Sequence, residues 1–145
     1  MIALLQRVSS ASVAVEAAVI ARIDSGVLAF IGVQQGDDEK QALRLCERIL
    51  GYRLFEDGRG RMNLSLKDTG GGLLLVPQFT LAADTSSGMR ASFTAAAAAE
   101  KAVELFDLVV SSASRRHPHV ACGRFGADMQ VALVNEGPVT FWLQA

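Results

Sequence analysis

The sequence is poor in the residue types that most often mark metal sites, disulfides and nucleophilic catalysis. It contains two cysteines and two histidines in 145 residues, and neither Cys46 nor Cys122 belongs to a CxxC pair. Two cysteines without a secretory signal are more often buried thiols than a disulfide, so we expect two free thiols. The histidines lie together in a His117-Pro118-His119 segment that has no carboxylate or cysteine beside it and is more typical of a solvated loop than of a zinc site. No G-x-S-x-G turn for a catalytic serine is present.

Long apolar runs and an excess of one charge are also missing. No run reaches the roughly 18 apolar residues of a membrane span, and Arg7 comes too early for the core of a long signal sequence. Fourteen basic and fifteen acidic residues give a net charge of −1, which indicates no general affinity for nucleic acid. Any nucleic-acid contact must therefore be local. We expect a cytoplasmic protein with no membrane and no DNA partner.

What the chain does contain suits one compact unit. Hydrophobic residues make up 50% of the sequence and charged residues 20%. A chain of this size buries roughly 68–70% of its unfolded surface when it folds. We therefore predict a single domain over residues 1–145, without internal repeats or linkers.

The first third of the chain predicts strands and then a helix. Residues 2–8, 12–23 and 27–33 have strand character, separated by turn residues at Ser9-Ser10 and at 24–26, which indicates an antiparallel meander. A helix should begin at 36–38, where acidic side chains can cap it, and end near 51–54. Its buried face has three- and four-residue spacing and consists of Ala42, Leu45, Cys46, Ile49 and Leu50.

The middle of the chain predicts a loop and a buried strand. Residues 56–61 form a polar, glycine-rich loop whose two arginines could contact a phosphate backbone, although such loops are more often only solvated. Residues 63–66 are a candidate short strand, and 69–72 a turn. Residues 73–81 are almost unbroken apolar sequence, typical of a strand buried on both faces. Pro77 cannot donate to a sheet, so this strand must lie at an edge, be bulged or end there.

The last third predicts a helix and three strands. Thr94 is a candidate N-cap for a helix that includes the alanines at 95–99 and ends at Arg115-Arg116, before the histidine segment. Its buried stripe should be Ala102, Leu105, Phe106, Val109 and Val110. Strands are predicted at 120–126, 129–134 and 139–143. Between the last two, Gly137-Pro138 has the character of a tight turn that can direct carbonyl oxygens outward, although an ordinary hairpin is the more common outcome.

Two short motifs carry a family resemblance. Pro77-Gln78-Phe79-Thr80-Leu81 and Asn135-Glu136-Gly137-Pro138-Val139-Thr140 resemble the two signature motifs of the D-aminoacyl-tRNA deacylases, also known as the D-tyrosyl-tRNA deacylase family. The likeness extends over the whole length, in the same order, and this makes it far more specific than either motif alone. Further matching stretches are 1–8, 45–53, 62–64, 81–85, 88–90 and 123–131.

The resemblance implies a fold, an activity and a site. The fold would be a single α/β domain with a curved, barrel-like, mostly antiparallel sheet and two main helices. The enzyme would hydrolyse the ester at the 3′ end of D-aminoacyl-tRNA, as a homodimer that needs no metal or organic cofactor, and would also remove glycine mischarged on tRNA for alanine. In the family the Gly-Pro bond is cis, and the pair reaches into the partner subunit's pocket, where it rejects L-amino acids by steric clash. Gly137 and Pro138 match that pair, Arg7 matches an arginine beside it, and Met129 matches a methionine at the pocket.

Ester hydrolysis needs a water, a place for the oxyanion and a hold on the amino acid. A strand interrupted at Pro77 would leave the backbone N–H groups of Gln78, Phe79 and Thr80 free for the oxyanion, while carbonyls of Gly137 and Pro138 would hold the substrate ammonium. Besides water, the Thr80 hydroxyl is a candidate nucleophile, but no adjacent base is evident in the sequence. A rigid backbone wall would distinguish chirality without depending on the identity of the side chain.

One position departs from the family pattern. Pro77 stands where the first motif usually has serine, which removes a hydroxyl and an N–H group. A non-catalytic tRNA-binding protein on the same fold therefore remains the main alternative. A hydrolase of some other small acyl ester is a second one, since the net charge is close to zero.

Overall fold

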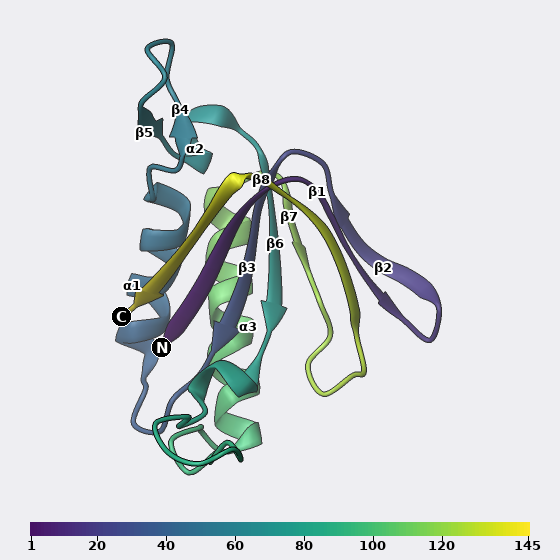
Figure 1. Cartoon of the computed structure of the whole chain (residues 1–145), viewed down its shortest axis with the longest axis vertical. Coiled ribbons are helices and arrows are strands. Elements are labelled where there is room, and N and C mark those ends of the chain that lie inside the picture. Colours follow the sequence, from purple (N-terminus) through teal and green to yellow (C-terminus); the bar gives the residue numbers. More distant parts are fainter.

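The computed structural model describes residues 1–145, and its centre is one mixed β-sheet with helices packed against it (Figure 1). The elements are β1 (Ile2–Val15), β2 (Ala18–Ile23), β3 (Gly26–Gly32), α1 (Glu39–Gly51), β4 (Phe55–Glu56), β5 (Met62–Leu64), α2 (Leu66–Thr69), β6 (Gly72–Pro77), η1 (Phe79–Ala82), α3 (Ala99–Arg116), β7 (Val120–Cys122) and β8 (Gln130–Gln144). The sheet order is β2-β1-β3-β6-β7, and β8 also pairs with β1.

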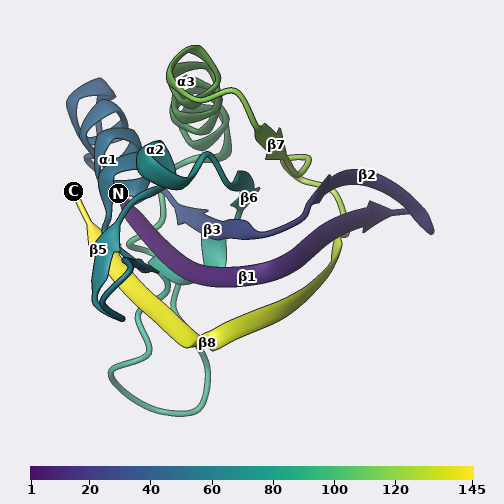
Figure 2. The ribbon, with the colours of Figure 1, turned by 90° about the horizontal axis from the view of Figure 1, so that it is seen from above.

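The sheet is curved and mostly antiparallel, as predicted. β1 pairs antiparallel with β2, β3 and β8, whereas the β3–β6 and β6–β7 pairs are parallel. Seen from above, β1 and β8 bend together, and the three helices lie on the opposite side of β3 and β6 from β8 (Figure 2). The predicted α/β fold with a curved sheet and two main helices, α1 and α3, is confirmed.

The first strand is longer than the sequence predicts. β1 continues through Ser9 and Ser10, so the predicted turn at this point is wrong. The register between β1 and β8 does shift between Val8 and Ser10, which leaves Ser9 without a partner in β8. The two serines therefore mark a bulge, in which one extra residue is inserted into a continuing strand.

The predicted strand over 12–23 is divided by a tight turn. Glu16 and Ala17 have φ angles of 49° and 63°, the left-handed conformation of a two-residue hairpin turn. Glycine and asparagine favour this conformation, so the sequence contains no signal for the turn. β2 then pairs with residues 11–15 of β1, and β3 pairs with residues 2–8. The predicted meander is therefore wrong, because both following strands pair with β1.

Helix α1 begins where its capping chemistry predicts. The Asp38 carboxylate accepts the backbone N–H groups of Lys40 at 2.7 Å and Gln41 at 3.3 Å, and the Gln41 side chain accepts the Asp38 N–H at 3.0 Å. This reciprocal capping box satisfies N–H groups that the first turn cannot pair. Asp37 does not cap the helix, since its carboxylate forms an ion pair with the Met1 amino group at 2.5 Å.

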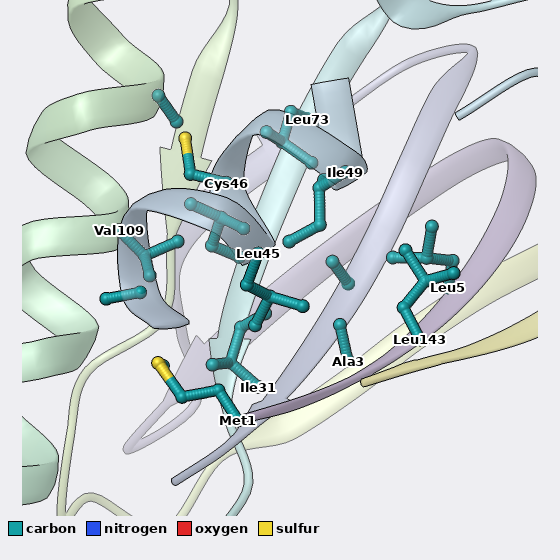
Figure 3. Packing of buried hydrophobic residues seen from close by; sticks show 14 of the residues in the cluster. Met1, Ala3, Leu5, Ile31, Leu45, Cys46, Ile49, Leu73, Val109 and Leu143 are labelled. Atoms are coloured by element: carbon teal, nitrogen blue, oxygen red, sulfur yellow. The ribbon is translucent and has the colours of Figure 1, made fainter. Parts of the chain in front are cut away.

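The main core lies between the two long helices and the sheet. Figure 3 shows Leu45, Cys46 and Ile49 of α1 facing Val109 of α3 and Leu73 of β6. The buried face predicted for α1 is confirmed in full. The stripe predicted for α3 is also buried, except that Val110 is only partly covered.

Helix α3 starts later than predicted. Its first residue is Ala99, and Thr94 does not cap it. The alanines before it pair with the segment that follows β3 instead: the Gln35 N–H donates to Ala95 O at 2.8 Å, and the Ala97 N–H donates to Val33 O at 3.1 Å. Strong helix propensity is overridden here because backbone groups of these alanines already have partners in that segment.

The histidine segment is not a solvated loop throughout. His117 is buried, and its Nε2 lies 2.6 Å from the Gly71 carbonyl oxygen. His117 thus fastens the end of α3 to the glycine turn that precedes β6. The cysteines match expectation, since both are free thiols: Cys46 is buried and Cys122 is partly covered. Burial is the main reason why the pKa of each thiol is raised.

None of the helices has both the length and the apolar character needed to cross a membrane.

Two glycines give a matched test of the packing. An added Cβ at Gly26 would lie 1.9 Å from the Gly72 carbonyl oxygen, where β3 and β6 begin to pair, whereas one at Gly51 would meet nothing within 4 Å. We expect Gly26→Ala to lower the free energy of unfolding by about 3 kcal/mol or more, because backbone must move. Gly51→Ala, at the end of α1, should be neutral or stabilising by up to about 1 kcal/mol. Urea unfolding followed by circular dichroism measures both, and equal stability of the two variants would contradict this packing.

Candidate active site

Strand β6 ends at Pro77, and the chain turns at once into the 3-10 helix η1. Residues 73–77 are buried, and Ile31 of β3 pairs with Pro77 in the last step of the parallel ladder. Of the three outcomes that proline allowed, the strand ends there. Gln78 precedes the helix, and Phe79 is its first residue.

The start of η1 leaves two backbone N–H groups unpaired. In a 3-10 helix each N–H bonds to the carbonyl three residues back, so the first N–H groups have no acceptor within the helix. The N–H groups of Phe79 and Thr80 donate to no acceptor in the chain, and both residues are exposed. Gln78 is different, because its N–H donates to Ile31 O at 2.8 Å. The prediction that the Gln78 N–H is also free is therefore wrong.

The Thr80 hydroxyl has no base beside it. Its hydrogen-bond partner is the Gln78 side-chain amide, which neither takes up nor releases a proton near neutral pH. Asp84 follows four positions later, but hydrogen bonds from the Ser86 side chain and backbone N–H lower the pKa of its carboxyl. A carboxylate with a lowered pKa is a weak proton acceptor at neutral pH. The arrangement offers backbone donors rather than an activated nucleophile.

A cavity of about 300 Å³ lies beside the end of β6. Residues 76–79 line one side of it, and residues 125–129 line the other, so the fold brings Gln78, Phe79 and Met129 together. The Met129 side chain is partly buried, and its sulfur accepts the Arg124 N–H at 3.3 Å. Phe79 is 57% exposed, and its ring lies 5.1 Å from the ring of Phe93. The cavity is of the size that takes a small ligand.

Gly137-Pro138 is a bulge rather than the tight turn of a hairpin. β8 continues through this pair without reversing, so the two strands predicted at 129–134 and 139–143 are one. Asn135 pairs with Val8 and Thr140 pairs with Gln6, so the four residues 136–139 of β8 lie opposite Arg7 alone. Residues 136–138 are exposed, Gly137 has a φ of 124°, and the Gly137-Pro138 bond is cis. Proline is tolerated here because β8 is an edge strand and is bulged at this point.

Arg7 and Asn135 hold the bulge. Arg7 Nε donates to Glu136 O at 3.2 Å, and its Nη1 donates to Leu54 O at 2.8 Å. The Asn135 side-chain amide donates to two carbonyls, Arg7 O and Val139 O, both at 3.0 Å. An added Cβ at Gly137 would lie 2.8 Å from Arg7 Nη2, so the arginine packs directly against the glycine. These contacts fix the backbone of the bulge from both strands.

The bulge and the free N–H groups lie far apart within one chain. The register places Arg7 level with Val27 and Leu73, while Pro77 lies four residues further along β6. At about 3.3 Å per residue this is a separation of roughly 13 Å along the strand alone. Gln78, Phe79, Thr80 and Met129 thus form one group, and Arg7, Gly137 and Pro138 form another.

Two residues of these groups are not distinguished by the local sequence alone. Asn135 belongs to the second motif, and the signal for its role is that asparagine beside a turn often bonds to nearby backbone groups. Phe125 lines the cavity, and nothing in its local sequence distinguishes it from an ordinary core residue. Its position depends on the loop that joins β7 to β8.

Comparison with known proteins gives a consistent match in sequence. A family model described as D-Tyr-tRNA(Tyr) deacylase matches residues 4–144. The chain is 67% identical to a D-aminoacyl-tRNA deacylase of Thioalkalivibrio sulfidiphilus, over 99% of this chain and 97% of that protein. A protein of the same name from Methylococcus capsulatus is 60% identical over 99% of this chain and 94% of its own length.

Solved structures give the same fold. A protein described as c-Myc DNA Unwinding Element Binding Protein superposes with a TM-score of 0.95 at 33% identity, over 100% of this chain and 99% of the other. A probable eukaryotic D-amino acid tRNA deacylase superposes with a TM-score of 0.83 over 99% and 98% of the two chains. At 16% identity, the second likeness concerns the fold alone.

Proposed function

The chain belongs to the D-Tyr-tRNA(Tyr) deacylase family, and from this premise we propose that it is a chiral proofreading enzyme in the cytoplasm that works through its backbone. As a D-aminoacyl-tRNA deacylase it is an ester hydrolase, which releases D-amino acid and tRNA. The observation that carries the mechanism is the pair of unpaired N–H groups at Phe79 and Thr80.

These two N–H groups form the proposed oxyanion hole. When water attacks the ester carbonyl carbon, the carbonyl oxygen gains negative charge, and donors that are already in place stabilise it without rearranging. One such donor contributes roughly 10²–10³ in rate. The tetrahedral intermediate then collapses by expelling the ribose oxygen, which takes up the proton that the attacking water gives up. The neighbouring ribose hydroxyl lowers the demand on the protein. Gln78 has a positioning role: its N–H donates to Ile31 O, and this bond fixes the start of η1.

The bulge of β8 forms the proposed chiral filter. Residues 136–139 have no register partner in β1, and this supports carbonyls of Gly137 and Pro138 as acceptors for the substrate ammonium. Arg7 and Asn135 hold the backbone of the bulge, so it cannot move aside for the side chain of an L-amino acid. Glycine has no side chain to reject, and the proposed filter therefore also admits glycine mischarged on tRNA for alanine.

The two groups meet only if two copies of the chain combine. The roughly 13 Å of β6 between them within one chain supports a homodimer in which the bulge of one subunit enters the cavity beside Gln78, Phe79 and Met129 of its partner. Pro77 does not disturb this arrangement, because the N–H groups that it leaves in place at Phe79 and Thr80 are the ones the mechanism needs. The mechanism requires no metal or organic cofactor.

The activity is tested on a pair of mirror-image substrates. Purified protein should rapidly release D-tyrosine from D-tyrosyl-tRNA and spare L-tyrosyl-tRNA, with a metal chelator present throughout. Acid-precipitable radioactivity over time measures both reactions. Protection of both esters would favour a tRNA-binding protein without catalysis, and equal loss of both would exclude the filter.

Gly137→Ala tests the filter. The added Cβ would lie 2.7 Å from Val139 Cγ2 and 2.8 Å from Arg7 Nη2, at a φ that only glycine adopts readily. We expect kcat/KM for D-tyrosyl-tRNA to fall at least tenfold, because the bulge must shift. Gly36→Ala is the matched control, since Gly36 also has a positive φ of 88° but nothing within 4 Å of an added Cβ. Both variants should lose roughly 1 kcal/mol of stability through backbone strain, and normal activity of Gly137→Ala would argue against a backbone filter.

Thr80→Ala separates the backbone from the hydroxyl. The substitution keeps the Thr80 N–H and removes Oγ1, whose partner is the Gln78 amide. If the N–H groups stabilise the oxyanion, kcat should fall by less than about tenfold. This is well short of the roughly 10²–10³-fold loss of rate that follows removal of an oxyanion donor. Single-turnover hydrolysis of D-tyrosyl-tRNA measures this. A rate reduced to that of the uncatalysed ester would instead assign the chemistry to the hydroxyl.

A further inference from the structure

We propose that one end of the molecule is a preformed binding surface for the phosphodiester backbone of the tRNA substrate, and this proposal rests on the proposed function. The surface, here called the cationic face, consists of Arg53, Arg59, Arg61, Lys67, Arg115 and Arg116. Figure 1 shows its location: α1 and α3 both end there, and the β4–β5 hairpin extends beyond them.

The cationic face comes from segments that are distant in sequence but adjacent in space. Lys67 lies on α2, which is next to α1 in the view from above (Figure 2). The positive charges of Lys67, Arg115 and Arg116 all act on the Cys46 thiol, and those of Arg53 and Lys67 act on the Asp68 carboxyl. Arg59 and Arg61 lie in the turn of the β4–β5 hairpin. The fold therefore concentrates positive charge at one end of a chain whose net charge is −1.

All six cations are free for a ligand. They are exposed, and none takes part in an ion pair or donates a side-chain hydrogen bond. The carboxylates nearby are engaged elsewhere: Glu47 pairs with Arg44 at 2.5 Å, and Asp68 accepts the Ser65 N–H at 2.7 Å. Exposed charges of this kind are usually paired or mixed in sign. Here the positive partners of a ligand are present and unpaired, and of the carboxylates nearby only Glu56 lacks a close partner, since its distance to Arg7 is 4.0 Å.

The hairpin turn that carries two of these arginines is rigid. The Asp57 carboxylate accepts the backbone N–H groups of Arg59 at 2.8 Å and Arg61 at 3.0 Å, and its other oxygen accepts the Asn63 amide at 2.7 Å. These hydrogen bonds, led by that from the Arg61 N–H, lower the pKa of Asp57. The carboxylate thus binds the backbone of the turn and leaves both guanidinium groups outside. A ligand would find the backbone of the turn already ordered, so binding would have to order only the two arginine side chains.

The cationic face is continuous with the bulge that the proposed function assigns to the amino acid. Arg7 contacts both, since it donates to Leu54 O beside β4 and to Glu136 O in the bulge. A groove of about 490 Å³ extends from the bulge to the base of the β4–β5 hairpin and is lined by Arg7, Phe55, Glu56 and Glu136, among others. An RNA strand whose 3′ end meets the bulge would therefore leave along this groove towards Arg59 and Arg61.

The chemistry of the cationic face suits the phosphates of a nucleic acid. Five of the six cations are arginine, whose planar fork matches two phosphate oxygens at once. Contacts of this type position a nucleic acid without distinguishing its sequence, which suits an enzyme that acts on many tRNAs. The cationic face thus supplies the local contact that a chain of nearly neutral charge needs.

Binding of uncharged tRNA, titrated with salt, tests the proposal without depending on activity. Arg59→Gln/Arg61→Gln removes two charges from the turn and keeps the backbone bonds to Asp57. Lys40→Gln/Lys101→Gln is the control, because it changes net charge equally at the opposite ends of α1 and α3. Each phosphate contact contributes about 0.7–0.9 to the slope of log K against log salt, so the first variant should lose about 1.5 from the slope and the control nothing. Thermal unfolding checks that both variants are folded.

Kinetics on two substrates separate this proposal from the proposed function. In Arg59→Gln/Arg61→Gln, KM for D-tyrosyl-tRNA should rise roughly tenfold with kcat unchanged, because the lost contacts are made equally before and during reaction. KM for D-tyrosyl-adenosine, the same ester without phosphates, should not change. If wild-type protein hydrolyses both esters but the variant keeps the wild-type slope and KM, the cationic face is excluded and the proposed function stands. If neither ester is hydrolysed, the proposed function fails, and the slope alone still supports or excludes the cationic face.

Discussion

The pairing of β1 with β8 is the constraint on which the rest of the structure depends. The two strands contact one another over nearly their whole lengths, from Ile2 opposite Gln144 to Ala14 opposite Gln130. Within this ladder four residues of β8 must pass a single residue of β1, Arg7, so the surplus backbone has to leave the plane of the sheet. A bulge of this size keeps one shape only if side chains hold its backbone at both ends. Arg7 and Asn135 supply them, and the same contacts that complete the ladder also shape the bulge.

Arg7 links three parts of the molecule that are otherwise separate. Its guanidinium contacts the bulge, the backbone before β4 and, at 4.0 Å, the Glu56 carboxylate. The side chain is mostly covered, so it acts less as a surface charge than as a multivalent donor to carbonyl oxygens. Arginine suits this position because its donors point in fixed directions within one plane. A lysine would satisfy one carbonyl at a time and would leave the others unpaired.

At the other end of the sheet, where β6 leads into η1, backbone donors rather than acceptors are left without partners. β6 stops at Pro77, the next N–H is taken by β3, and the two that follow are free because a 3-10 helix begins there. Unpaired N–H groups are costly when buried but tolerated at an exposed helix start. The fold thus keeps a surplus of acceptors at the bulge and a surplus of donors at η1, at two places that lie four residues apart along β6.

The sequence by itself determined the two long helices with most of their buried faces and the main strand segments, and through the two motifs it supplied the candidate residues of the site. It also required β6 to change at Pro77, because proline lacks an N–H group wherever it occurs. These are local properties, set by periodicity, capping and the chemistry of single residues. The tertiary structure alone decided that Ser9-Ser10 is a bulge, that the alanines before Ala99 are not helical and that Gly137-Pro138 continues a strand. In each case the deciding factor was a hydrogen-bond partner from a distant segment, and no local pattern contains the position of that partner.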